Sequence, residues 1–171
     1  MRLTKFVTIV GMTLTLSGTA AFAEGFEIHD LTTLEKAVAA KFDKEAYHWA
    51  TPTNMSISCC GMDEDEIVSV TLDRQTDEIG KANRTDEAYI AELEDVCTKQ
   101  GICKIEEIEA GTAIARQVTL RNLGGGQSGV NIFAVKGGDR LTIQSSAKTT
   151  EIARDNAVKV LEALKGSLIG L

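Results

Sequence analysis

The stretch GVNIFAVKGGDRLTIQSSA, residues 129–147, decides the fold. Its centre, Lys136-Gly137-Gly138-Asp139, contains a Gly-Gly pair, and both glycines accept the positive φ angles that a tight hairpin turn requires. The runs on either side are rich in β-branched residues, which favour strands. We therefore expect two antiparallel strands joined by a short turn.

A helical pattern follows the second of these strands. In TTEIARDNAVKVLEALKG, residues 149–166, apolar side chains recur at the three- and four-residue spacing of one helix face. The residues expected on the buried face are Ala153, Ala157, Val160, Leu161 and Leu164. Gly166 is expected to end the helix. A GGD hairpin that passes into such a helix resembles the end of domains in the Mog1/PsbP-like group, and the resemblance implies a sheet closed by a C-terminal helix.

Strand signals also precede this hairpin. They lie in residues 55–59, 66–74, 103–110 and 113–121, where apolar and polar residues alternate or β-branched residues gather. The acidic stretch GMDEDE, residues 61–66, lies where the first of these segments passes into the second, so we expect it to form the turn of a second hairpin.

Two further segments show helical periodicity. In residues 30–42, Thr32 and Glu35 have the spacing of a capping box, and in residues 84–101 Thr85 is suited to cap a helix. The expected buried face of the first helix is Leu34, Ala37, Val38 and Phe42, and that of the second is Tyr89, Leu93, Val96 and Cys97. The order of all segments predicts an α+β fold, with an antiparallel sheet of about five to six strands covered by two to three helices.

The N-terminus has the features of a secretory signal peptide. Arg2 and Lys5 precede an apolar run, and Ala21-Phe22-Ala23 supplies an A-x-A cleavage site. The apolar run is shorter than the roughly 20 residues that span a bilayer, and no cysteine follows it to accept a lipid anchor. We expect residues 1–23 to be removed, and residues 24–171 to form a single domain in the periplasm or secreted medium.

The charge of this expected mature chain limits its partners. Without Arg2 and Lys5 it carries 16 basic and 25 acidic residues, a net charge of −9. Such a chain repels phosphate backbones and anionic lipid, which argues against nucleic acid and membrane surfaces as partners.

Four cysteines remain in the expected mature chain, and the cysteines of exported proteins are usually oxidised to disulfides. One pairing joins Cys97 at the end of a helix to Cys103 at the start of a strand, and leaves Cys59 and Cys60 to each other. The other joins each of Cys59 and Cys60 to one of the later two. The spacing leaves both pairings open.

Two kinds of chemistry would need free thiols. A thiol–disulfide oxidoreductase normally carries C-x-x-C at a helix N-terminus, a pattern that neither cysteine pair has. Soft thiolate and thioether ligands select copper(I), and the candidate ligands near the adjacent cysteines are Cys59, Cys60, Met62, Met55 and His48.

The sequence shows no convergent nucleophile and base, so we expect no enzymatic activity. The leading hypothesis is an exported binding or accessory domain that is stabilised by disulfides and interacts with another exported or membrane protein. A copper-binding protein and a thiol–disulfide protein are the alternatives.

Overall fold

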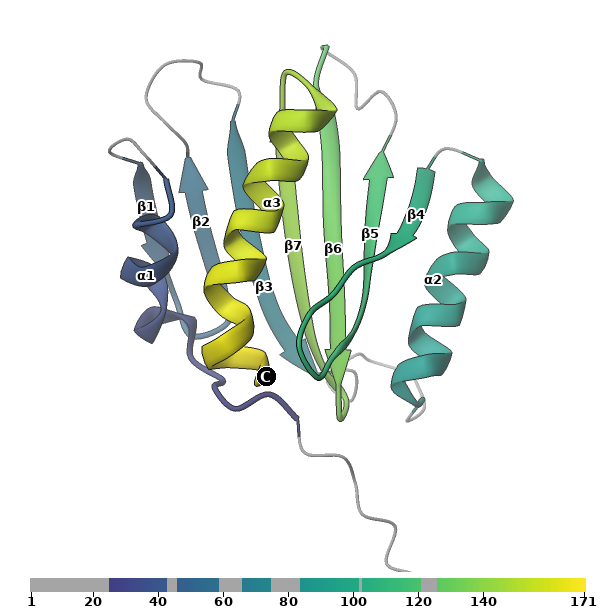
Figure 1. The fold of residues 1–171 in the computed structure, drawn as a ribbon, viewed down its shortest axis with the longest axis horizontal. Helices are drawn as coiled ribbons and strands as arrows, with labels where there is room; N and C mark the ends of the chain where they lie inside the picture. The colour runs from purple at the N-terminus through teal and green to yellow at the C-terminus, as the bar shows by residue number, and fades with distance from the viewer. Residues whose placement is uncertain (1–24, 43–45, 59–65, 75–83, 102, 121–125) are drawn as a thin grey trace, which may run out of the picture.

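The computed structural model describes residues 25–42, 46–58, 66–74, 84–101, 103–120 and 126–171. These residues form a seven-stranded antiparallel sheet in the order β1-β2-β3-β7-β6-β5-β4, with helices packed against it (Figure 1). The strands are β1 (Tyr47–Ala50), β2 (Asn54–Ser58), β3 (Ile67–Arg74), β4 (Cys103–Glu107), β5 (Ile114–Leu120), β6 (Ser128–Lys136) and β7 (Asp139–Ala147). The α+β class is confirmed. The expected number of five to six strands is wrong, because β1 lacks the alternation that marks the other strands.

The hairpin with the Gly-Gly turn lies at the centre of the sheet. β6 and β7 pair from Ser128↔Ala147 to Lys136↔Asp139. Gly137 and Gly138 connect them with φ angles of 58° and 86°, which confirms the turn expected from the Gly-Gly pair. The other expected hairpin also forms, because β2 and β3 pair up to Ser58↔Ile67 on either side of residues 59–65, which lie outside the described residues.

The main core lies between one face of the sheet and helix α3 (Thr150–Leu164). All five apolar residues expected on the inner face of this helix are buried: Ala153, Ala157, Val160, Leu161 and Leu164. Gly166 was expected to end the helix, but the helical path continues past it. The chain continues through a π-helical segment, Lys165–Ile169, because Leu168 and Ile169 are also buried, and it turns away at Gly170 with a φ angle of 91°.

The first helical segment is shorter than expected. A 3-10 turn, Leu31–Thr33, precedes helix α1 (Glu35–Ala39), and both lie on the α3 side of the sheet (Figure 1). Asp30, rather than Thr32, caps the turn, because its side chain accepts a hydrogen bond from the Thr32 amide. Leu34, Val38 and Phe42 are buried as expected, whereas Ala37 is exposed.

Helix α2 (Asp86–Gln100) packs on the opposite face of the sheet. Its Glu94 accepts a hydrogen bond of 2.6 Å from Arg116 Nε of β5. Arg116 directly follows Ala115 on β5, and neighbouring strand residues point to opposite faces of the sheet. Because Ala115 belongs to the core under α3, Arg116 and the helix that it contacts lie on the other face. Thr85 caps this helix as expected. The expected buried stripe is only partly correct, because Val96 is exposed and the fully buried positions are Ile90 and Cys97.

Candidate functional site

Cys97 and Cys103 form a disulfide, with their Cα atoms 5.5 Å apart. It joins the last turn of α2 to the first residue of β4, the outermost strand on that side of the sheet. This pairing rules out the alternative in which Cys97 and Cys103 are bonded separately to Cys59 and Cys60. Those two residues lie outside the described part of the chain.

Loss of this disulfide should loosen α2. The bond closes a short loop, so it should contribute about 2 kcal/mol to the free energy of unfolding, at the low end of the usual range. We expect reduction to lower the melting temperature and the Cys97→Ala/Cys103→Ala variant to melt at that lower temperature without reductant. Thermal unfolding followed by circular dichroism would measure both. Equal melting temperatures for the oxidised and reduced wild type would contradict the expectation.

The structure describes only two of the five candidate copper ligands, Met55 and His48. Cys59, Cys60 and Met62 lie outside the described residues. Met55 is buried in the core beneath the helices, and His48 Nδ1 lies 2.7 Å from Glu35 Oε1. Among the residues that the structure describes, no group of three His, Cys, Asp or Glu side chains could hold a metal ion. The copper site and the redox activity of Cys59 and Cys60 stay predictions.

Ion pairs on the surface shift the pKa values of several side chains in the direction that favours their charged forms. A hydrogen bond from Lys104 lowers the pKa of Glu106, and one from Lys165 lowers the pKa of Glu109. The same contact with Glu109, with help from Glu162, raises the pKa of Lys165. Such shifts are typical of surface ion pairs. Of these pairs, Lys165–Glu109 links the segment after β4 to the end of α3.

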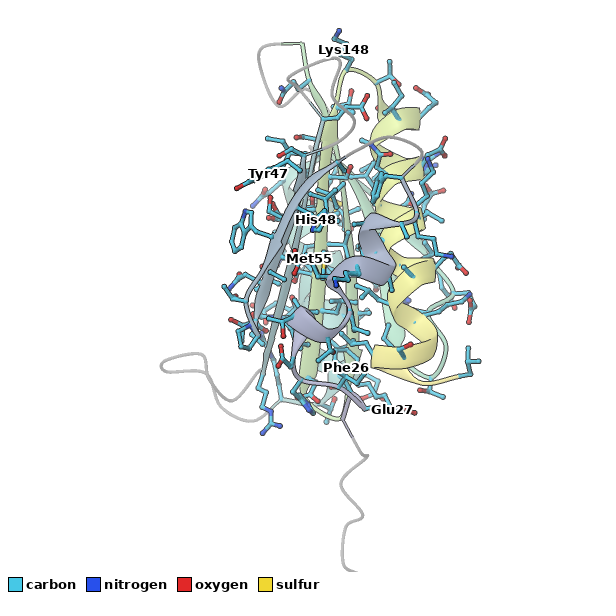
Figure 2. All side chains as sticks on the ribbon, turned by 90° about the vertical axis from the view of Figure 1, so that its left-hand side faces the viewer. Phe26, Glu27, Tyr47, His48, Met55 and Lys148 are labelled. Carbon is cyan, nitrogen blue, oxygen red and sulfur yellow. A yellow bond between two sulfur atoms is a disulfide. The ribbon has the colours of Figure 1, made fainter. Side chains whose placement is uncertain are left out.

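The most distinctive surface is the face of the sheet opposite α3, which we call the open face. α2 covers its β4–β5 end, and Tyr89 at the start of α2 reaches Arg140 of β7, 5.4 Å from the ring centre. The rest of the face, over β1, β2, β3 and β7, carries no helix among the described residues (Figure 1). Figure 2 views the sheet from the β1 side and shows Tyr47 projecting away from α3. The register aligns the open-face side chains in rows, such as Tyr47–Ser58–Ile67–Ser146 and Trp49–Ser56–Ser69–Gln144.

The uncovered part of the open face is almost free of charge. Its polar side chains are Asn54, Ser56, Ser58, Ser69, Thr71, Thr142, Gln144 and Ser146. The only ionic groups among its strand residues are Asp73 and Arg140, which bind each other at one end with a contact of 2.7 Å. A quarter of the whole chain is charged, so this lack of charge distinguishes the face from the rest of the surface.

Three large apolar side chains lie at the β1 end of this face. The exposed fractions are 73% for Tyr47, 46% for Trp49 and 43% for Ile67. We call these three residues the β1 patch. Clustering of exposed aromatic and aliphatic side chains on an otherwise polar surface is typical of interaction sites.

The β1 patch is not predicted from the sequence because β1 itself is not predicted. The segment Thr51-Pro52-Thr53-Asn54 contains turn-forming residues directly before the alternation of β2, so it could have indicated a hairpin with a preceding strand. Among the sequence-based expectations, His48 is named only as a candidate copper ligand, and Trp49 is not considered. A scan of the chain against protein-family models finds no match, and a search of curated proteins finds none either.

Proposed function

We propose that this protein is an exported, non-catalytic binding domain that acts through the β1 patch on another exported or membrane protein. The observation that carries the proposal is the exposure of Tyr47, Trp49 and Ile67 together on a face nearly without charge. Aromatic side chains of this kind provide most of the binding energy in many protein interfaces. We also propose that the fold is related to that of Mog1/PsbP-like domains, and no part of the proposed function is drawn from that resemblance.

One observation supports the proposed compartment. The disulfide Cys97–Cys103 is of a kind that persists in oxidising compartments. No helix among the described residues is long and apolar enough to cross a membrane.

Site-specific photo-crosslinking tests the proposed surface. With p-benzoylphenylalanine in place of Trp49 or Tyr47, illumination of expressing cells should yield a discrete adduct with another protein. The control is the same probe in place of Val96, which is exposed to a similar degree on α2 but lies outside the β1 patch. Identical adducts from positions 49 and 96, or no adduct from positions 47 and 49, would contradict the proposal.

The export hypothesis gives a separate expectation. The mature protein should begin at Glu24, because cleavage follows the Ala21-Phe22-Ala23 site. Mass spectrometry of the protein purified from the export compartment should find residues 1–23 missing. Recovery of the full chain with Met1, in a membrane fraction, would show that the N-terminal segment acts as an anchor.

A further inference from the structure

The two outer strands of the sheet differ in their protection against pairing with another chain. β4 carries three charged residues among five, Lys104, Glu106 and Glu107, and it is tied to α2 by the disulfide. Charged side chains on an outer strand discourage the addition of a further strand. β1 has the sequence Tyr-His-Trp-Ala and contains no Lys, Arg, Asp or Glu. Of the two edges, only that of β1 lacks this protection.

The hairpin between β1 and β2 fixes which backbone groups of β1 point outward. The Thr51 amide donates to the Asn54 carbonyl at 2.7 Å, so these two residues form a hydrogen-bonded pair. In an antiparallel ladder such pairs alternate with non-hydrogen-bonded ones. The register Tyr47↔Ser58 and Trp49↔Ser56 therefore places hydrogen-bonded pairs at residues 47 and 49. The amides and carbonyls of His48 and Ala50 consequently point to the free edge of the sheet.

This edge is accessible in the described part of the chain. No described strand pairs with the outer side of β1, which is the first strand in the sheet order. α1 packs on the α3 side of the sheet, where His48 contacts Glu35, and Figure 2 shows β1 facing the viewer along the side of the molecule. The exposed rings of Tyr47 and Trp49 lie on the opposite side of the same strand.

We propose that an extended segment of the partner protein adds to the outer edge of β1 as an eighth strand. This inference rests on the proposed function and names how the partner binds. The partner's backbone would pair with the outward amides and carbonyls of His48 and Ala50, since an extended polypeptide presents the matching donors and acceptors. Every second side chain of that segment would lie beside Tyr47 and Trp49 on the open face, where apolar or aromatic residues fit.

The charge of the protein limits which extended segments can bind at this edge. The expected mature chain carries a net charge of −9, whereas β1 contains no Lys, Arg, Asp or Glu. A strongly acidic segment would be repelled by the protein as a whole, and a neutral or basic one would not. The expected binding sequence is therefore extended, neutral to basic, and apolar at alternate positions.

A phage-displayed library of random linear dodecapeptides, selected on the purified mature protein, provides a probe. Peptides that match this pattern should be enriched. Ala50→Pro removes one outward amide and leaves the β1–β2 hydrogen bonds in place, so it should weaken the binding of the selected peptides about tenfold, as expected for the loss of one backbone hydrogen bond. Ala50→Val, which keeps the amide, is the matched control and should bind like the wild type. His48→Pro serves the same purpose if Ala50→Pro fails to fold.

Hydrogen exchange provides a readout that needs no substitution. Peptide binding should slow exchange at the amides of His48 and Ala50, whereas those of Tyr47 and Trp49 should already be protected by β2. A library without such peptides, or peptides that protect no β1 amide, would overturn the inference. Binding that is lost in Trp49→Ser but unchanged in Ala50→Pro would overturn strand addition and leave the proposed function standing. A homodimer that Ala50→Pro disperses would show that a second copy, rather than a partner, occupies the edge.

Discussion

Leu161→Ala should lower the free energy of unfolding by about 2–5 kcal/mol, the range found for emptied core leucine sites. Leu161 has no exposed surface, and it lies on the inner face of α3 in the core between this helix and the sheet. Truncation to alanine removes apolar contacts and leaves a cavity that close packing on both sides prevents from collapsing. Chemical denaturation, followed by circular dichroism at equilibrium, would measure the change.

The control lies on the outer face of the same helix. Asp155 is exposed, so Asp155→Ala should change the free energy of unfolding by less than about 0.5 kcal/mol. Lys159 is a poorer control than its outward position suggests, because its Nζ lies 5.9 Å from the centre of the Phe42 ring. Losses of similar size from Leu161→Ala and Asp155→Ala would show that the buried face of α3 has been assigned incorrectly.

The parts of the fold that the sequence predicts correctly are those in which local signals agree with tertiary contacts. In β6–β7, turn glycines and β-branched strands favour the same hairpin, and in α3 the apolar period matches the buried face. α3 ends at Leu164, close to the stop expected at Gly166, but the chain remains helical beyond it. There the local signal of Gly166 gives way to the burial of Leu168 and Ile169. Such competition between propensity and packing cannot be read from the chain alone.

The pairing of the cysteines shows a different limit. Connectivity depends on the distance between Cα atoms, which spacing in the chain does not determine. The structure selects the local pair because Gly101, with a φ angle of 65°, reverses the chain between α2 and β4. The sequence had made this arrangement plausible without excluding the other.

The candidate site was beyond prediction because it depends on strand order. Tyr47 and Ile67 are 20 positions apart in the chain, and they share a row only because β1, β2 and β3 pair in this register. The importance of Asp139 was missed for the same reason. In the sequence it follows a turn, whereas in the structure it is a buried carboxylate at the start of β7.

Asp139 joins three segments that are distant in the chain. Its Oδ2 accepts a hydrogen bond of 2.7 Å from the Phe26 amide and lies 2.6 Å from His29 Nε2. Its Oδ1 lies 3.1 Å from Arg74 Nε at the end of β3. The N-terminal segment is thereby fixed against the central hairpin. A side chain at Gly25 would clash with the same carboxylate, since a Cβ atom there would overlap Oδ2.

Asp139→Ala should therefore lower the free energy of unfolding by about 1–3 kcal/mol, because it leaves the buried Phe26 amide without an acceptor. The contact with Arg74 should contribute little to this loss, since that side chain is 57% exposed and solvent screens the pair. Asp95→Ala, which breaks an exposed ion pair with Lys99, is the matched control and should cost less than about 1 kcal/mol. Denaturant titration would measure stability, and hydrogen exchange should show that the amide of Phe26 loses its protection in Asp139→Ala. Unchanged protection there would mean that the Asp139 carboxylate does not hold the N-terminal segment in place.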